Sequence, residues 1–178
     1  MSGYNDFSAH PLTMETYSRS ALYSPQSSMR GSRPILVVED DRDGVVILQH
    51  AFKQAGVSNS LRPMENASMA MAYLAGQPPF EDRIANPLPA VLLLDLGLPG
   101  GSGLRVLKWV RSHPKLHSMV VVILTGSANP QDICNAYSAG ANSYLLKPRS
   151  LPLLVKLLQS FSDYWLVQNQ QPLDVAAE

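Results

Sequence analysis

The stretch "VLLLDLGLPGGSG" (residues 91–103) joins a run of four apolar residues to a carboxylate and several glycines. Such a run is typical of a strand that is covered on both faces of its sheet. Asp95 follows the run directly, and a carboxylate is costly to bury unless another group pairs with it. The rest of the chain must therefore supply both a doubly covered sheet and partners for Asp95.

Short apolar runs and segments of helical periodicity alternate on both sides of this stretch. The runs that predict strands are 34–38, 60–64, 90–95, 119–125 and 143–147. A helix is expected after each run; Gly56 ends the first helix, and the fourth is opened by Pro130 and ended by Gly140. Pro63 lacks an N–H for an interior strand, so the second strand is predicted at an edge. Five strands alternating with five helices indicate an α/β protein with a parallel sheet.

The chain divides into three parts by composition. Residues 1–33 are rich in Ser and show no sustained periodicity, which predicts a flexible N-terminal arm. Residues 34–166 are expected to form one domain, and residues 167–178 a polar C-terminal tail. Within the domain, residues 76–89 hold four prolines and one glycine, so they are predicted to form a loop.

The charge and cysteine content exclude several function classes. Fourteen basic residues balance fourteen acidic ones, so no net charge attracts the chain to nucleic acid or to a membrane surface. The single cysteine, Cys134, rules out an internal disulfide and is expected to pack within a helix. No apolar run is long enough for a membrane span, and no signal peptide is recognisable. A cytoplasmic location is therefore expected.

Polar residues stand where four of the predicted strands end. They are Glu39, Asp40, Asp41, Asp95, Thr125 and Lys147. In an open parallel sheet the carboxyl ends of the strands form the ligand site, so these side chains should meet at one edge. Three or more carboxylates repel one another unless a cation lies among them, and oxygen ligands of this kind suit Mg²⁺.

Each of these residues also has an ordinary structural explanation. The acids at 39–41 could cap the following helix, Asp95 could be a turn residue, and Lys147 could be a solvated charge. Their joint placement on successive strand ends favours phosphoryl transfer to a carboxylate. In that chemistry Asp95 attacks a phosphorylated donor while Mg²⁺ and Lys147 stabilise the transferring group. The glycines beside Asp95, and Gly126 after Thr125, would leave room for the donor.

Four blocks of the sequence match one known family in order. They are "ILVVEDD" (35–41), "LLLDLGLPGGSG" (92–103), "VVVILTG" (120–126) and "GANSYLLKP" (140–148). From Pro34 to about Trp165 the chain resembles the receiver domain of two-component response regulators. This resemblance implies the flavodoxin-like (βα)₅ fold with strand order 2-1-3-4-5. It also implies a phosphoacceptor that catalyses only its own phosphorylation and dephosphorylation, rather than an enzyme acting on other substrates.

The resemblance assigns roles residue by residue. Asp95 would accept the phosphoryl group, Asp40 would ligate Mg²⁺ directly, and Glu39 would act on the metal mainly through water. The backbone carbonyl of Gly97 would be a further ligand. The positions that bind the phosphoryl group or switch with it would be Thr125, Gly126, Tyr144, Lys147 and Pro148. The Lys147–Pro148 bond is expected to be cis, as in most of the family.

The lengthened loop 76–89, the "DYWL" at 163–166 and the lack of an output domain resemble the single-domain regulators of bacterial phytochromes. The expected partner is a histidine kinase or phosphotransfer protein. A homodimer could form through the fourth and fifth helices or through "DYWL". Gly97 stands where the family often has a larger side chain, so the lifetime of the acyl phosphate stays open.

Two other functions compete with this one. A receiver-like scaffold would bind its partner without phosphorylation, and the complete set of site residues argues against it. An aspartate-dependent phosphohydrolase would need a second Asp two residues after Asp95, where Gly97 stands.

Overall fold

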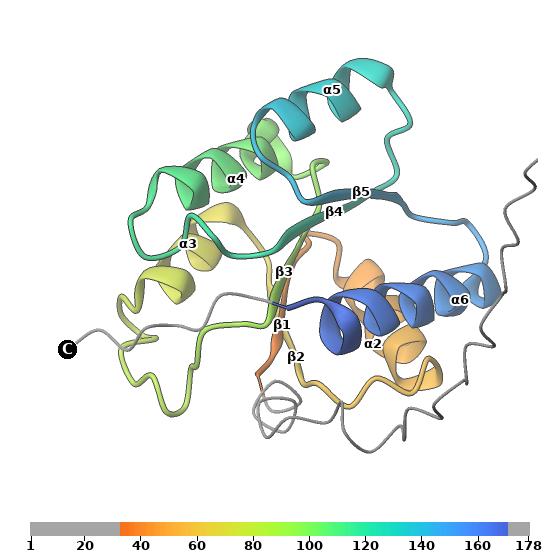
Figure 1. Cartoon of the computed structure of the whole chain (residues 1–178), viewed down its shortest axis with the longest axis horizontal. Coiled ribbons are helices and arrows are strands. Elements are labelled where there is room, and N and C mark those ends of the chain that lie inside the picture. The colour runs from red at the N-terminus through yellow and green to blue at the C-terminus, as the bar shows by residue number, and fades with distance from the viewer. Residues whose placement is uncertain (1–32, 171–178) are drawn as a thin grey trace, which may run out of the picture.

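The computed structural model describes residues 33–170 (Figure 1). Its elements, in chain order, are β1 Ile35–Val38, α2 Arg42–Gln54, β2 Leu61–Met64, α3 Ala67–Ala75, β3 Val91–Leu94, η2 Pro99–Gly101, α4 Ser102–Ser112, β4 Val121–Thr125, α5 Pro130–Ser138, β5 Ser143–Leu146, α6 Leu151–Ser162 and η3 Asp163–Gln168. The predicted arm (1–33, apart from Arg33) and most of the predicted tail (171–178) lie outside the described residues. None of the helices within 33–170 has the length and apolar character of a membrane span.

The five strands form one parallel sheet in the order β2-β1-β3-β4-β5, which confirms the predicted flavodoxin-like topology. β2 is an edge strand, as Pro63 predicted. Helices α2 and α6 cover one face of the sheet, and α3, α4 and α5 cover the other (Figure 1).

Alternate residues of each inner strand pack into the two layers of the core, one on each face of the sheet. In β3, Leu92 and Leu94 pack toward α3 and α4, whereas Val91 and Leu93 pack toward α2 and α6. This alternation follows from the two-residue period of a strand, and it explains why the strand shows no polar positions. The doubly covered sheet holds its carboxyl edge rigidly, and that edge carries the polar residues.

The long loop before β3 is tied to the end of α3. Arg83 donates from Nη1 to the Tyr73 carbonyl at 2.7 Å and from Nη2 to the Leu74 carbonyl at 3.0 Å. Because the last carbonyls of a helix have no partners within it, the guanidinium completes the hydrogen bonding of α3. The buried Tyr73 in turn donates its hydroxyl to the Pro87 carbonyl at 2.7 Å, and Phe80 packs edge-on against the Tyr73 ring.

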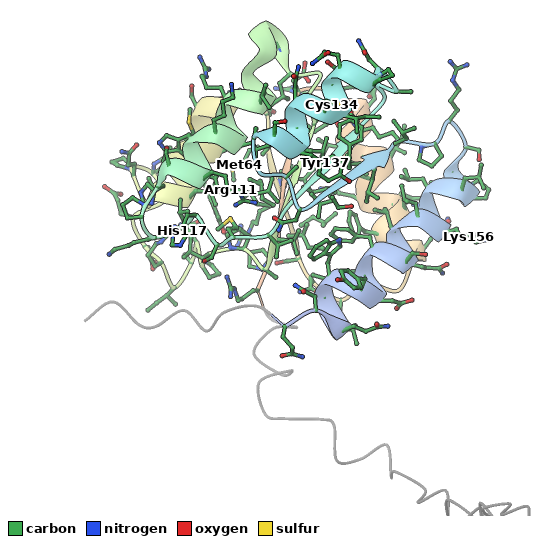
Figure 2. The ribbon with its side chains drawn as sticks, turned by 45° about the horizontal axis from the view of Figure 1, so that its top comes forward. Met64, Arg111, His117, Cys134, Tyr137 and Lys156 are labelled. Carbon is green, nitrogen blue, oxygen red and sulfur yellow. The ribbon has the colours of Figure 1, made fainter. Side chains whose placement is uncertain are left out.

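Two local predictions were wrong. Cys134 lies on the exposed side of α5 rather than in the core, since α5 buries only its Ala136 face (Figure 2). The Lys147–Pro148 bond is trans, and the cis bond of the described chain lies at Pro78–Pro79. The trans form is the one that X–Pro bonds favour in general, by about 0.5–1 kcal/mol.

Candidate functional site

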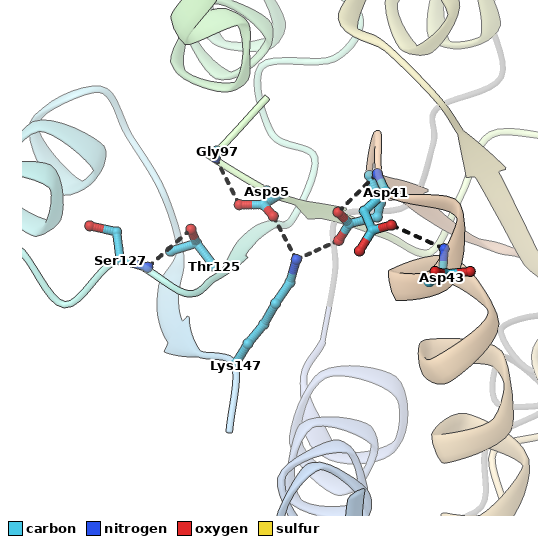
Figure 3. Close-up of polar contacts among 8 residues, drawn as sticks. Asp41, Asp43, Asp95, Gly97, Thr125, Ser127 and Lys147 are labelled. Atoms are coloured by element: carbon cyan, nitrogen blue, oxygen red, sulfur yellow. Dashed lines mark hydrogen bonds and ion pairs between the residues drawn. The ribbon is translucent and has the colours of Figure 1, made fainter. Parts of the chain in front are cut away.

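The strand order brings four predicted site residues to one edge of the sheet. Glu39 follows β1, Asp95 follows β3, Thr125 ends β4 and Lys147 follows β5. Because β1, β3, β4 and β5 are successive neighbours, these residues lie at the same carboxyl edge of the sheet, and Figure 3 shows Asp95, Thr125 and Lys147 gathered there. The predicted gathering of polar residues at the carboxyl edge is therefore observed.

Lys147 is the partner that makes the two buried acids tolerable. Its ammonium Nζ lies 2.5 Å from Oδ2 of Asp95 and also forms an ion pair with the carboxylate of Glu39 (Figure 3). Glu39 is only 4% exposed. Burial lowers the pKa of Lys147, but its hydrogen bonds and charge interactions with Asp95 and Glu39 raise that pKa above its ordinary value.

Asp95 is held in its ionised form. Burial raises the pKa of its carboxyl, but the hydrogen bond and charge of Lys147, the Gly97 backbone and the Thr125 hydroxyl together lower that pKa below its ordinary value. The Gly97 N–H donates to Oδ1 at 2.8 Å, while Lys147 occupies Oδ2. An ionised and oriented carboxylate is the form that can act as a nucleophile.

The acidic residues after β1 have separate positions. Asp41 caps α2, since its Oδ1 accepts from the Asp43 N–H at 3.1 Å (Figure 3), so the capping alternative holds for this residue. Glu39 points inward to Lys147, and Asp40 is exposed at the rim. The crowding of carboxylates predicted from the sequence is thus only partly realised, and the Lys147 ammonium lies among the acids that do meet.

The donor set fits Mg²⁺. Within residues 33–170 no three His, Cys, Asp or Glu side chains converge into a complete metal-ligand group. Mg²⁺ does not require one, because it uses one or two carboxylates, keeps several waters and accepts carbonyl oxygens. The residues expected to hold it, Glu39 and Asp40 after β1 and Asp95 and Gly97 after β3, all follow neighbouring strands at this edge.

Three glycines near the acids have different roles. Gly126 has open space on all sides within 4 Å of where a Cβ would be, which agrees with the predicted access for a donor. A Cβ on Gly103 would lie 2.2 Å from the Asp95 carbonyl oxygen. Gly103 therefore permits close packing of α4 on the loop after β3, a requirement that the sequence interpretation missed. A Cβ on Gly44 would lie 3.3 Å from the side chains of both Glu39 and Asp41, which is a tight contact but a much milder one than at Gly103.

Ser127 joins the two predicted switch residues. The buried Thr125 accepts at Oγ1 from the Ser127 N–H at 3.4 Å, and Tyr144 donates its hydroxyl to the Ser127 carbonyl at 3.0 Å. Burial is the largest of the causes that raise the pKa of Tyr144. A movement of Thr125 would therefore reach Tyr144 through the loop between β4 and α5. Sequence analysis did not select Ser127, because a serine after a strand is common in turns.

A cavity of about 410 Å³ opens beside Asp95. Its lining residues are Asp95, Leu96, Gly97, Leu104, Thr125, Gly126, Ser127, Asp132 and Asn135. The cavity exposes Asp95 to one side of the molecule, between α4 and the start of α5. This space is large enough to admit a phosphorylated group together with part of its carrier.

Known proteins share both the sequence pattern and the fold. The profile of the family described as response regulator receiver domain matches residues 35–159. Response regulator Rcp1 of Synechocystis is 35% identical over 132 residues, which are 74% of this chain and 88% of that protein. The phosphorylated cyanobacterial phytochrome response regulator RcpA superposes with a TM-score of 0.72 at 29% identity, covering 79% of this chain and 99% of that one. The Mn²⁺-bound form of Rcp1 gives a TM-score of 0.69 at 34% identity, with coverages of 79% and 99%.

Proposed function

Since this chain belongs to the response regulator receiver domain family, we propose that it receives a phosphoryl group on Asp95 from a histidine kinase or a phosphotransfer protein. The observation that most supports this proposal is the placement of Asp95. Its carboxylate is held ionised by Lys147 and opens into a cavity of about 410 Å³. A side chain kept only for stability would not need that access.

The residues around Asp95 have different roles in the phosphoryl transfer. A carboxylate oxygen of Asp95 attacks phosphorus, and the bond to the donor breaks with its electron pair leaving on the donor atom. Lys147 pairs with Asp95 before transfer and is placed to pair with a phosphoryl oxygen afterwards. The Thr125 hydroxyl and the open position at Gly126 lie on the other side of the nucleophile. Mg²⁺, when bound, would neutralise charge on the transferring group.

The signal would then pass to another protein by a change of surface. Phosphorylation would pull the Thr125 hydroxyl toward the phosphoryl group. Ser127 hydrogen-bonds to both Thr125 and Tyr144, so the movement would reach the surface of α5 and β5. That surface exposes Tyr137 by 51% and Leu146 by 47%, which is typical of a site that a protein partner covers. Homodimerisation is proposed through this surface or through the C-terminal segment with Tyr164.

We also propose that the signal comes from a phytochrome kinase. The support is the similarity to Rcp1 and to RcpA, which is described as a phytochrome response regulator. A phytochrome kinase should transfer its phosphoryl group to this chain many times faster than a kinase from an unrelated pathway does. Equal rates from both kinases would remove the light-dependent part of the proposal and leave the receiver function intact.

The central test is direct phosphorylation. The full chain is incubated with Mg²⁺ and acetyl phosphate, and its intact mass is measured. We expect the mass to increase by one phosphoryl group in the parent and in the surface control Asp163→Asn, but not in Asp95→Asn. No mass gain with any donor or kinase would instead support a scaffold that works without phosphorylation.

A further inference from the structure

The cavity beside Asp95 has two unlike walls. Leu96 and Leu104, from the segment after β3 and from α4, form its apolar wall, and Ser127, Asp132 and Asn135, from the β4–α5 loop and α5, form its polar wall. The apolar wall suits a flat ring, and the polar wall suits a ring that carries an N–H donor. An acetyl group offers neither feature, whereas an imidazole offers both.

Asp132 is the acidic group of this polar wall. It lies in the first turn of α5, and its Oδ2 accepts from the Ser127 hydroxyl at 2.6 Å. An acid in a first turn is favourable to the helix by itself, so a purely structural role must be considered. That role does not require the side chain to line the cavity that contains Asp95, as it does here. Within residues 33–170 no hydrogen bond is made to its Oδ1, which leaves that oxygen as an acceptor for a molecule in the cavity.

We propose that Asp132 selects the phosphodonor of this site by accepting a hydrogen bond from the N–H of a phosphorylated imidazole. This inference rests on the proposed function and adds a residue that determines the preference of the site among phosphodonors. The donor enters protonated on the ring nitrogen that does not hold phosphorus. As the Asp95 oxygen forms its bond to phosphorus, the phosphorus–nitrogen bond breaks and its electron pair stays on the ring. The ring leaves as neutral imidazole, with its N–H still bonded to Asp132.

The same carboxylate acts against donors with an anionic leaving group. Acetate develops negative charge as it departs and has no N–H to offer, so a carboxylate in the cavity wall repels it. A hydrogen bond to a charged acceptor is worth about tenfold or more in a rate. Asp132 should therefore raise the ratio of phosphoimidazole to acetyl phosphate reactivity rather than both rates together.

The experiment compares initial rates of Asp95 phosphorylation from phosphoimidazole and from acetyl phosphate at saturating Mg²⁺. Asp132→Asn should lower the rate with phosphoimidazole by about tenfold and leave the rate with acetyl phosphate unchanged or higher. Asp132→Glu, which restores the charge, should recover most of the preference. Asp163→Asn, an acid-to-amide change on the exposed surface, should behave like the parent.

A second measurement needs no variant. Phosphoimidazole methylated on its free ring nitrogen has no N–H. The parent should therefore be phosphorylated about tenfold more slowly by it, after the rate is corrected for the donor's reactivity toward hydroxylamine. Equal losses with both donors in Asp132→Asn, or no loss with the methylated donor, would overturn the selection role and leave Asp132 a helix-capping residue. Failure of the parent to react with any donor would instead contradict the proposed function itself, and the selection role with it.

Discussion

At the scale of single residues, Lys147 stabilises the charge of the acids that β1 and β3 bring together. Asp95 has a pKa below its ordinary 3.8, so its pairing stabilises the fold above that pH and is lost as the pH falls through the lower folded value. Lys147 has a pKa above its ordinary 10.5, so its contribution persists up to that pH and is lost as the pH rises through the higher folded value. Between these limits Asp95 and Lys147 are both charged.

Removal of the Lys147 ammonium should reverse the way stability depends on pH in the acidic range. Lys147→Met leaves the Asp95 carboxylate without its cation, so burial should raise the folded pKa of Asp95 and the variant should gain stability as the pH falls from 7 toward 4. At pH 7 we expect the free energy of unfolding to be lower than that of the parent by about 1–3 kcal/mol. Urea unfolding in EDTA at several pH values measures this, with the exposed Lys156→Met as control. Parallel pH curves for parent and Lys147→Met would contradict it.

Gly103 supports the site through the backbone rather than through a side chain. In Gly103→Ala the new Cβ would meet the Asp95 carbonyl oxygen at 2.2 Å, so α4 or the loop after β3 must shift. We expect a loss of about 1–3 kcal/mol in urea unfolding, together with slower phosphorylation of Asp95. Gly126→Ala, which meets nothing within 4 Å, should change stability by less than about 0.5 kcal/mol. Equal stability of the two variants would contradict this prediction, because it would show that the loop after β3 moves with no loss of free energy of unfolding.

At the scale of elements, the sequence predicted what depends on local pattern. The strand that contains Leu92 and the edge position of Pro63 followed from periodicity and from the missing N–H. The anchoring of the loop by Arg83 could not be predicted, because it depends on where the end of α3 lies in space. The inward position of Glu39 and the capping position of Asp41 were likewise undetermined, since adjacent acids have the same sequence signal.

The loop anchored by Arg83 gives a prediction for this scale. Arg83→Ala removes hydrogen bonds to the carbonyls of Tyr73, Leu74 and Asn86. It should lower the free energy of unfolding by about 1–3 kcal/mol. Amide hydrogen exchange in residues 76–89 should become faster as well. Arg62→Ala removes a single bond of 3.2 Å to the same loop and should have a smaller effect on both measurements. A loop that exchanges equally fast in the parent and in Arg83→Ala would contradict the anchoring role.

At the scale of the whole molecule, the strand order converts sequence spacing into a site. The fold and the position of Asp95 among polar side chains were predictable because four strand ends carry polar residues and the topology makes those strands neighbours. The cavity wall was not predictable, because Asp132 reaches Asp95's side of the molecule only through the packing of α5 on the sheet. The surface proposed to contact a partner depends on the same packing of α5 on the sheet, since Tyr144 and Leu146 lie two residues apart on one face of β5.

This connection between site and surface favours the α5–β5 face over the C-terminal segment for self-association that depends on phosphorylation. Sedimentation velocity with Mg²⁺ and a phosphodonor should show a larger species than the untreated chain does. Leu146→Glu should prevent that change, because it places a charge on the exposed edge strand beside Tyr144. Tyr164→Glu, an equally exposed position in η3, should leave it intact. Loss of association only in Tyr164→Glu would assign the contact to the C-terminal segment, and Tyr144 would then signal to a different partner.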